Sequence, residues 1–399
     1  MGTGHTHLSG ITKRPRASER TSIILAVIVG IVVFITLLGA AMTWPSDDDF
    51  RGTLPTIDPG ARWVSAEVVA TNDDGTFDVI IDNEQEAGPE VMLDPGDPTL
   101  EISVGDPVRA MQLENGQVIF ADFERGPPMV LLLIVYVVLV IAVAWWRGLG
   151  ALLGLALAFG IVLFYTVPAL FDGANPLITG LVTGSGALFM LLYIAHGPNA
   201  RTTTAYLGTL AGLVVTAVLA WWAVRESNLT GLWNEEGIHL EFWYRDVSLT
   251  GLVLCGIVLA GLGVLNDVTV TQASAVWELR TARPDISRWD LYWRAMRIGR
   301  DHIASTVYTI SFAYVGAALP TIMIVSLYDT TVGATLTSAD IAEEIVRTLV
   351  GSIGLVLAVP LTTAIGAIVV GYDAVVTEED EGQGAIDPVL LEGAKPDAQ

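Results

Sequence analysis

The chain has 399 residues, of which 52% are hydrophobic and only 16% are charged, against about 25% charged residues in a soluble globular protein. This composition favours a polytopic membrane protein over a soluble enzyme, a disordered chain or a fibrous protein. The formal net charge of −23 argues against nucleic-acid binding, which requires a basic face. Cys255 is the single cysteine, so neither an intramolecular disulfide nor a cysteine-based metal site is expected.

The first predicted element is a membrane anchor at residues 22–42, which follows a basic leader at residues 1–21. Its apolar run is longer than the roughly 7–15 residues of a signal-peptide core, and no small-residue cleavage site follows it. We therefore expect an uncleaved transmembrane helix, with a cleaved signal peptide as the alternative. The leader is expected to be disordered and cytoplasmic.

Residues 46–126 are too polar to cross a membrane and are expected to form a soluble extracytoplasmic domain. Five runs alternate or are rich in β-branched residues, and Gly, Asn and Asp turn signals separate them. These predicted strands are residues 62–71, 75–81, 100–104, 107–113 and 117–123. Five short strands predict a small Greek-key or OB-like β-barrel.

The same domain is strongly acidic, with 19 Asp and Glu residues and 4 Arg. A solvated surface explains this acidity, and cation binding is the sharper alternative. Residues 72–78 (NDDGTFD) superficially resemble a calcium loop, but they lack the ligand spacing and the Glu at position twelve of an EF-hand. A hairpin turn at Asp74-Gly75 explains the run better.

Seven further apolar runs, each near the length of a membrane span, predict a seven-helix membrane domain at residues 127–372. They are residues 127–146, 149–171, 177–195, 203–224, 247–270, 303–327 and 345–372. With a cytoplasmic N-terminus, 13 Lys and Arg residues fall inside and 7 outside, as the positive-inside rule requires. We therefore expect a plasma-membrane protein with eight spans, both termini cytoplasmic, and a disordered acidic tail at residues 373–399.

Residues 275–301 are expected to form an amphipathic cytoplasmic segment. Apolar and aromatic side chains alternate there with six Arg. Such a segment lies on the inner leaflet, where Arg meets anionic headgroups and Trp lies at the interface.

Polar side chains at the cytoplasmic ends of the sixth and seventh spans, and at the start of the eighth, define a candidate polar path. By helical spacing Asp267, Thr271 and Ser274 share one face, and ionisable groups inside spans usually face a bundle interior or a water path. The full set is Asn266, Asp267, Thr271, Ser274, Asp301, His302, Thr306, Thr309, Glu344, Arg347 and Ser352.

Two other roles are alternatives to a polar path for these residues. In the first, Asp267 lies at the headgroups and forms an ion pair with Arg297 or Arg300, which would only fix the loop between the two spans. A hydrolytic site is disfavoured because the sequence contains no GxGD, G-x-S-x-G, H-E-x-x-H or Walker A motif. No catalytic residue, metal ligand or cofactor is predicted, and the protein is not expected to be an enzyme.

Three runs carry a family resemblance: residues 263–279 (GVLNDVTVTQASAVWEL), 298–314 (IGRDHIASTVYTISFAY) and 344–360 (EIVRTLVGSIGLVLAVP). With Val104-Gly105-Asp106 before them, they resemble the YibE/F-like family of bacterial membrane proteins in order and spacing, over residues 22–372. Asn266, His302 and Tyr308 depart from the family pattern, which weakens a side-chain role for His302. The resemblance implies a multi-spanning membrane protein and suggests transport, without a substrate.

The expected function is that of a permease-like secondary or passive transporter of an ion or small solute, because no ATP site is present. The alternative is a non-catalytic envelope scaffold or sensor whose outer β domain binds a partner. A continuous polar cavity between the last three spans favours transport, whereas a solid bundle with its polar groups paired to Arg favours the scaffold. Expected partners are bilayer lipids, with anionic inner-leaflet lipids at residues 275–300, the solute, and an envelope protein at the β domain.

Overall fold

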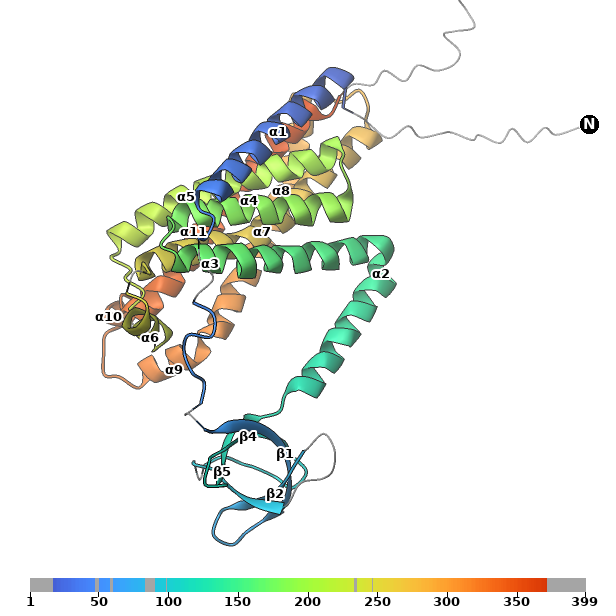
Figure 1. The fold of residues 1–399 in the computed structure, drawn as a ribbon. Coiled ribbons are helices and arrows are strands. Elements are labelled where there is room, and N and C mark those ends of the chain that lie inside the picture. The colour runs from blue at the N-terminus through green and yellow to red at the C-terminus, as the bar shows by residue number, and fades with distance from the viewer. Residues whose placement is uncertain are drawn as a thin grey trace, which may run out of the picture. The chain divides into compact units, whose positions relative to one another are not determined.

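The computed structural model describes residues 17–46, 50–57, 60–82, 90–97, 99–232, 235–245 and 247–371. It divides into two compact units, one formed by Ser46–Leu153 and the other by Met1–Pro45 together with Gly154–Gln399. The first unit contains a β-barrel, and the second contains a helical bundle (Figure 1). Most of the leader and the whole tail at residues 373–399, which are predicted to be disordered, lie outside the described residues.

Five strands close into a barrel in the order β1-β2-β3-β5-β4. Their bounds are β1 Arg62–Thr71, β2 Phe77–Ile81, β3 Glu90–Asp94, β4 Pro107–Gln112 and β5 Val118–Phe123. β1 pairs antiparallel with β2 and β4, whereas β3 and β5 pair in parallel. Side chains alternate between the interior and the surface along the strands, and Val68, Val79 and Leu93 are almost wholly buried. The predicted small closed β-domain is confirmed.

The third predicted strand, at residues 100–104, is wrong. These residues lie in turns, where the carboxylates of Asp97 and Asp106 accept the N–H groups of Thr99 and Ser103, each at 2.8 Å. Ile102 still packs into the barrel core, which explains the apolar pattern that suggested a strand. The third strand is β3 instead, whose alternation of buried Leu93 with exposed neighbours was obscured by the acidic residues at both of its ends.

The acidic run at residues 72–78 forms the β1–β2 hairpin turn, as predicted. Gly75 has a φ of 84°, a conformation that favours glycine. Asp74 Oδ1 accepts both the backbone N–H (3.0 Å) and the hydroxyl (2.6 Å) of Thr76. This carboxylate therefore stabilises the turn.

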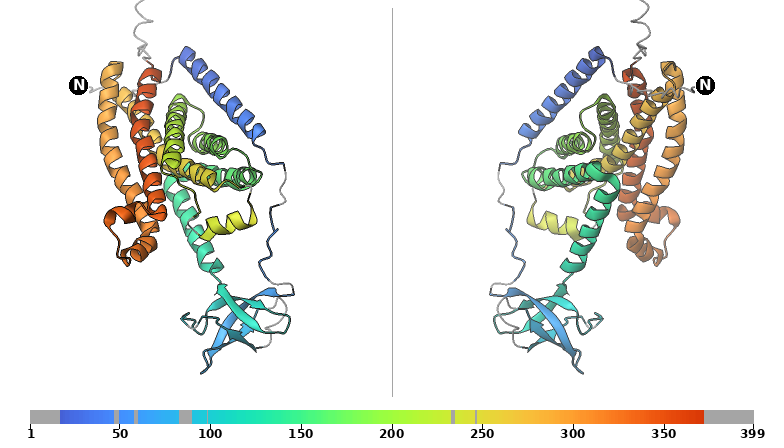
Figure 2. Two further views of the ribbon diagram at one scale, coloured as in Figure 1. Left: turned by 90° about the vertical axis from the view of Figure 1, so that its left-hand side faces the viewer. Right: turned by 90° about the vertical axis from the view of Figure 1, so that its right-hand side faces the viewer.

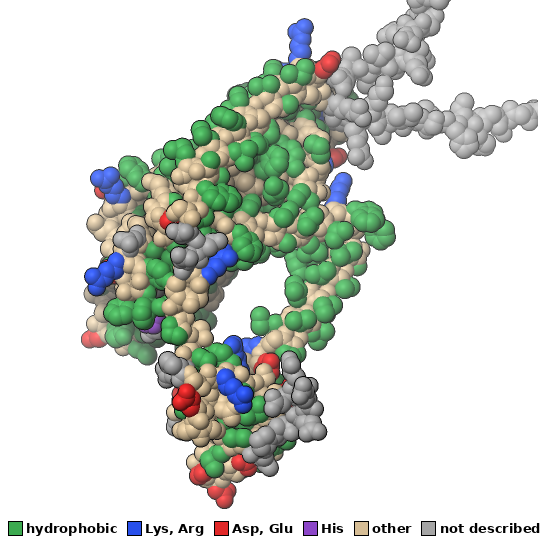
Figure 3. Space-filling view, viewed as in Figure 1, with side chains coloured by type: hydrophobic (Ala, Val, Ile, Leu, Met, Phe, Trp, Pro, Cys, Tyr) green, Lys and Arg blue, Asp and Glu red, His purple; other side chains and the backbone are tan. Residues whose placement is uncertain are grey.

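Helices long and apolar enough to cross a membrane number six in the described residues, or seven if one bent pair forms a single span. The elements are α1 Glu19–Met42, α2 Gly126–Ile161, the π-helix η1 Val162–Thr166, α3 Val167–Phe171, α4 Pro176–His196, α5 Ala200–Glu226, α6 Glu235–Trp243, α7 Leu249–Ala282, α8 Arg288–Ala317, α9 Leu319–Ser326, α10 Val332–Leu336 and α11 Ala339–Val369. Hydrophobic side chains cover the surfaces of α1 and α2 (Figure 3). Apolar surface of this extent indicates a membrane-embedded protein.

α2 joins two predicted spans and is broken at Trp145, whose φ of 53° is left-handed. The stretch Gly126–Phe171 has 46 residues and would measure about 69 Å as a straight helix, more than twice the hydrocarbon core of a bilayer. The chain turns back closely at the break, because a Cβ on Gly148 would lie 2.5 Å from the carbonyl oxygen of Val140. The break falls at the predicted boundary between the two spans.

Four helices of the bundle start at side-chain caps, which satisfy backbone N–H groups that have no partner inside the helix. Asn175 accepts N–H groups of α4, Asn199 of α5, Ser248 of α7 and Ser287 of α8. α7 and α8 are joined by the short turn at residues 283–287. The predicted amphipathic segment at 275–301 is thus the end of α7, this turn and the start of α8.

The predicted span at residues 303–327 is bent. α8 and α9 meet at an angle of 62°, next to Pro320, which lacks the N–H group that would continue the helix. α8 and α11 run side by side, with the short α9 and α10 at one end of the pair (Figure 2).

The centre of the bundle is formed by α5, α7 and α11. Small residues allow these helices to approach closely. A Cβ on Gly208 of α5 would lie only 2.8 Å from Cβ of Thr362 on α11, and one on Gly212 would lie 2.9 Å from Cβ of Ala358. Leu265 and Val268 of α7 are fully buried against this seam. Glycine is therefore required where α5 crosses α11.

Candidate functional site

The first predicted cluster forms one contact between α7 and α8. His302 Nε2 lies 3.8 Å from Asp267 Oδ2, with the Asp267 side chain 70% exposed and that of His302 29% exposed. This separation is too long for a hydrogen bond. Helical spacing thus placed the two residues together correctly, but the carboxylate points outward and not into a closed interior.

The other members of this cluster bond within their own helices. Their hydroxyl groups donate to backbone carbonyls one turn earlier: Thr271 to Asp267 (2.7 Å), Ser274 to Val270 (2.8 Å), Thr306 to His302 (2.9 Å) and Thr309 to Ser305 (3.1 Å). Asn266 is half-buried and Asp301 is exposed. Among the described residues, the side-chain oxygen of Asn266 and Nε2 of His302 are buried without a hydrogen-bond partner, so this contact retains polar atoms that no neighbour satisfies.

The arginines that could anchor Asp267 lie elsewhere. Within the described part of the chain, Asp267 pairs with neither Arg297 nor Arg300. The guanidinium of Arg300 lies over the ring of Trp293 instead, 5.8 Å from its centre.

The second predicted cluster, on α11, is a compact ion-pair group. Arg347 Nη2 lies 2.6 Å from Glu343 Oε1, and Arg347 Nη1 lies 3.2 Å from Glu344 Oε1. Their spacing of three and four residues places all three side chains on one helix face. Glu343 is buried, whereas Glu344 and Arg347 are partly exposed. Ser352, two turns later, is half-buried.

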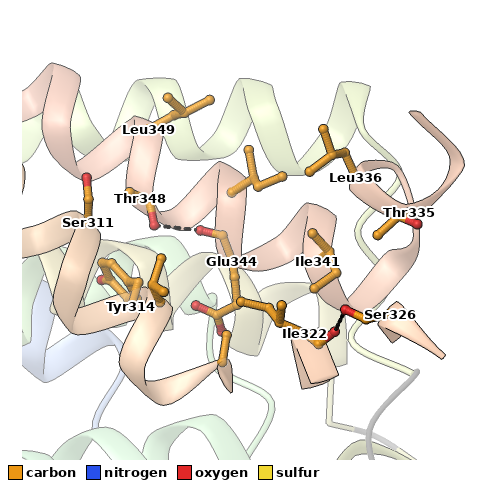
Figure 4. Close-up of a pocket in the computed structure, with 13 residues that line it drawn as sticks. Ser311, Tyr314, Ile322, Ser326, Thr335, Leu336, Ile341, Glu344, Thr348 and Leu349 are labelled. Atoms are coloured by element: carbon orange, nitrogen blue, oxygen red, sulfur yellow. Dashed lines mark hydrogen bonds between the residues drawn. The ribbon is translucent and has the colours of Figure 1, made fainter. Parts of the chain in front are cut away.

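Glu344 also lines a cavity of about 460 Å³ between α8, α9, α10 and α11. Its volume falls within the range of small-molecule sites. The wall is mainly apolar, and the Glu344 side chain extends toward Tyr314 (Figure 4). The lining residues include Ser311, Tyr314, Ala318, Ile322, Ser326, Glu344, Thr348 and Leu349. The cavity therefore lies where the bend between α8 and α9 separates these helices from α11.

Two buried polar residues were missed by the sequence analysis. Gln272 of α7 donates to the carbonyl of Ala295 (3.0 Å) and to the hydroxyl of Thr363 (2.7 Å), so one amide links α7, α8 and α11. Arg280 is 2% exposed and donates to the carbonyl of Ile286 at 2.7 Å, across the turn between α7 and α8. An amide within an apolar helix was the available signal for Gln272, whereas Arg280 was counted only as a positive charge.

A second cavity, of about 510 Å³, lies between α1, η1, α4 and α5. Its polar groups form a chain, in which Ser185 is hydrogen-bonded to Thr36 (2.8 Å) and Tyr206 (3.0 Å). Tyr165 and Thr166 of η1 bond to Thr43 and Thr183. Neighbouring hydroxyls satisfy one another here, so this cavity presents little free polarity.

No group of three or more His, Cys, Asp or Glu side chains in the described residues is arranged to hold a metal ion. The chain matches no curated protein and no solved structure. Residues 132–372, more than half of the chain, match the YibE/F-like protein family, and the chain therefore belongs to this family.

Proposed function

We propose that the protein is a permease-like secondary or passive transporter of a small solute or ion. The observation that carries this proposal is the cavity between α8, α9 and α11, with the carboxylate of Glu344 in its wall. Secondary transporters commonly place their sites at interrupted helices, and the cavity lies at such an interruption. Transport energy would come from a gradient, since the sequence contains no ATP-binding motif.

The proposal includes a specific membrane topology. Dividing the stretch Gly126–Phe171 at Trp145 gives two spans, and taking α8 with α9 as one span brings the total to eight. Both termini are then cytoplasmic in the plasma membrane and the barrel is external. The strand order 1-2-3-5-4, with β3 parallel to β5, supports an OB-like description of the barrel.

The start of α8 supports the proposed contact with anionic inner-leaflet lipids at residues 275–300. Trp289 and Trp293 are 68% and 44% exposed, and exposed arginines alternate with them along the helix. Aromatic side chains at the interface with Arg at the headgroups are typical of a membrane-surface helix.

Profiling intracellular ions and metabolites tests the transport proposal. A strain that lacks the gene is compared with strains complemented by the wild type, by Glu344→Gln or by Glu278→Gln. Glu278 is an exposed carboxylate on α7, so this control matches the change in charge. We expect at least one solute pool to change in the deletion strain, and to be restored by the wild type and Glu278→Gln but not by Glu344→Gln.

The alternative is a non-catalytic envelope scaffold or sensor whose barrel binds a partner. Its support is the close packing of α5, α7 and α11 and the exposed, outward-facing carboxylate of Asp267. Unchanged solute pools, with a deletion phenotype rescued by a chain that carries Glu344→Gln, would favour this alternative over transport.

A further inference from the structure

Most polar groups that line the cavity between α8, α9 and α11 present hydrogen-bond acceptors to it. The hydroxyl of Ser311 donates to Val307 (2.9 Å), that of Ser326 to Ile322 (2.6 Å) and that of Thr348 to Glu344 (2.8 Å), in each case to a backbone carbonyl. A hydroxyl has one proton and two lone pairs. With their protons already used, these three side chains present oxygen lone pairs to the cavity.

The charge next to the cavity is negative. Glu344 lines the wall, whereas Arg347 does not; its guanidinium is held between Glu343 and Glu344. Two carboxylates therefore contact this one guanidinium, and the carboxylate of Glu344 is the one that lines the cavity. A charge removed from water is stable only with a counter-charge or a proton.

The remaining wall is suited to an apolar body. Ala318, Ile322 and Leu349 contribute aliphatic surface, and Tyr314 contributes an aromatic ring beside Glu344 (Figure 4). Aromatic faces attract cations. Acceptor oxygens, a carboxylate and an aromatic ring in a mainly apolar wall are complementary to a cation with hydrophobic substituents, and they disfavour anions of the same size.

The geometry points to a binding site for hydrophobic organic cations in this cavity, with the Glu344 carboxylate as the counter-charge and Tyr314 as a positioning ring. This inference deepens the proposed function, because it names the chemical class of solute. The inferred cation site rests on the proposed transport function only in that this cavity is taken as the place where the solute binds.

Equilibrium binding to the purified full-length protein in detergent tests the site. The probe is radiolabelled tetraphenylphosphonium, and tetraphenylborate carries the same four phenyl groups with the opposite charge. We expect saturable binding of the cation, with tetraphenylborate at least about tenfold weaker as a competitor. Glu344→Gln should weaken cation binding at least about tenfold, whereas Glu344→Asp should retain part of it and Glu278→Gln all of it.

Several outcomes would overturn the inference. These are the absence of saturable binding to the folded wild type, equal competition by tetraphenylborate, and undiminished cation binding by Glu344→Gln. The comparison of the two probes uses wild-type protein, so it is decisive even if Glu344→Gln does not fold. Because binding is measured without flux, saturable binding in a protein whose deletion changes no solute pool would reject transport and leave the cation site standing.

Discussion

Helix α11 forms two very different contacts within the bundle. Against α5 and α7 it packs through glycine, alanine and threonine, at distances that leave no room for one further methyl group. Against α8 and α9 it leaves a cavity of about 460 Å³ next to a charged group. The comparison indicates an open part at residues 341–349 and a rigid part at residues 354–366 of one helix, since close-packed interiors resist change and cavities tolerate it.

The largest effect is expected from Gly208→Ala, on the closed side. The added methyl group would overlap Thr362, whose Oγ1, Cβ and Cγ2 atoms all lie within 3.0 Å of its position. Because rotation of Thr362 cannot relieve all three contacts, we expect a loss of about 3 kcal/mol in the free energy of unfolding. Thermal unfolding in detergent measures it.

The matched control for this prediction is Gly263→Ala on α7, where nothing lies within 4 Å of the new methyl group. It should be neutral or stabilising by up to about 1 kcal/mol, because alanine favours helix. Equal effects of the two substitutions would contradict close packing at Gly208.

A smaller loss of stability is expected from Gln272→Leu. The Gln272 side chain joins α7 to both α8 and α11. Leucine keeps the approximate volume but removes the hydrogen bonds to Ala295 and Thr363. We expect destabilisation by about 2 kcal/mol, the usual range for unsatisfied buried polar groups. Thr271→Val, at the exposed neighbouring position, serves as the control and should lie within about 0.5 kcal/mol of the wild type. An unchanged free energy of unfolding in Gln272→Leu would show that these two hydrogen bonds do not stabilise the bundle.

Filling the open side should hardly change stability. Ala318→Leu places extra atoms in the cavity, and we expect a change below about 1 kcal/mol in thermal unfolding, with tetraphenylphosphonium binding reduced in the same preparation. A loss of stability as large as that of Gly208→Ala would show that residues 341–349 of α11 are packed as closely as residues 354–366.

The smallest effect is expected outside the membrane unit, in a fragment of residues 47–124. We expect this fragment to fold alone, with a β-type circular dichroism spectrum and a cooperative melt. Hydrogen bonds from Thr76 lower the pKa of Asp74, and those from Thr99 lower the pKa of Asp97, each from an ordinary value of 3.8.

Because these pKa values are depressed by folding, the stabilisation is fully present above the ordinary value and is lost as the pH falls below it. Thermal melts should therefore show a slightly lower midpoint at pH 3 than at pH 6. The shift should be small, since both carboxylates are exposed. A helical or unfolded spectrum at neutral pH would contradict an independent barrel.

The sequence was most informative where a single local pattern determines the structure. Alternation and turn residues predicted four of the five strands, and hydrophobic length predicted the membrane helices. The family match begins at residue 132, so α1 and the barrel were inferred from pattern alone.

Features that depend on contacts between distant segments were not predictable in this way. Asp267 and His302 were placed near each other, but not the outward direction of the carboxylate. The cavity results from a bend beside Pro320, and a proline in a span does not reveal how far the helix turns. Gln272 was overlooked because its partners, Ala295 and Thr363, lie on two other helices.

The π-helix η1 behaves like a one-residue insertion that the helix has absorbed. The widened turn brings two consecutive side chains, Tyr165 and Thr166, to buried positions where each finds a hydroxyl partner. Deleting one residue from 162–166 would restore the ordinary pitch and leave the flanking segments in nearly the same orientation, because a widened turn takes up one extra residue. Sequences of related proteins that are one residue shorter at this point would therefore present the same helix faces to the lipid but lose one of these two buried hydroxyl contacts.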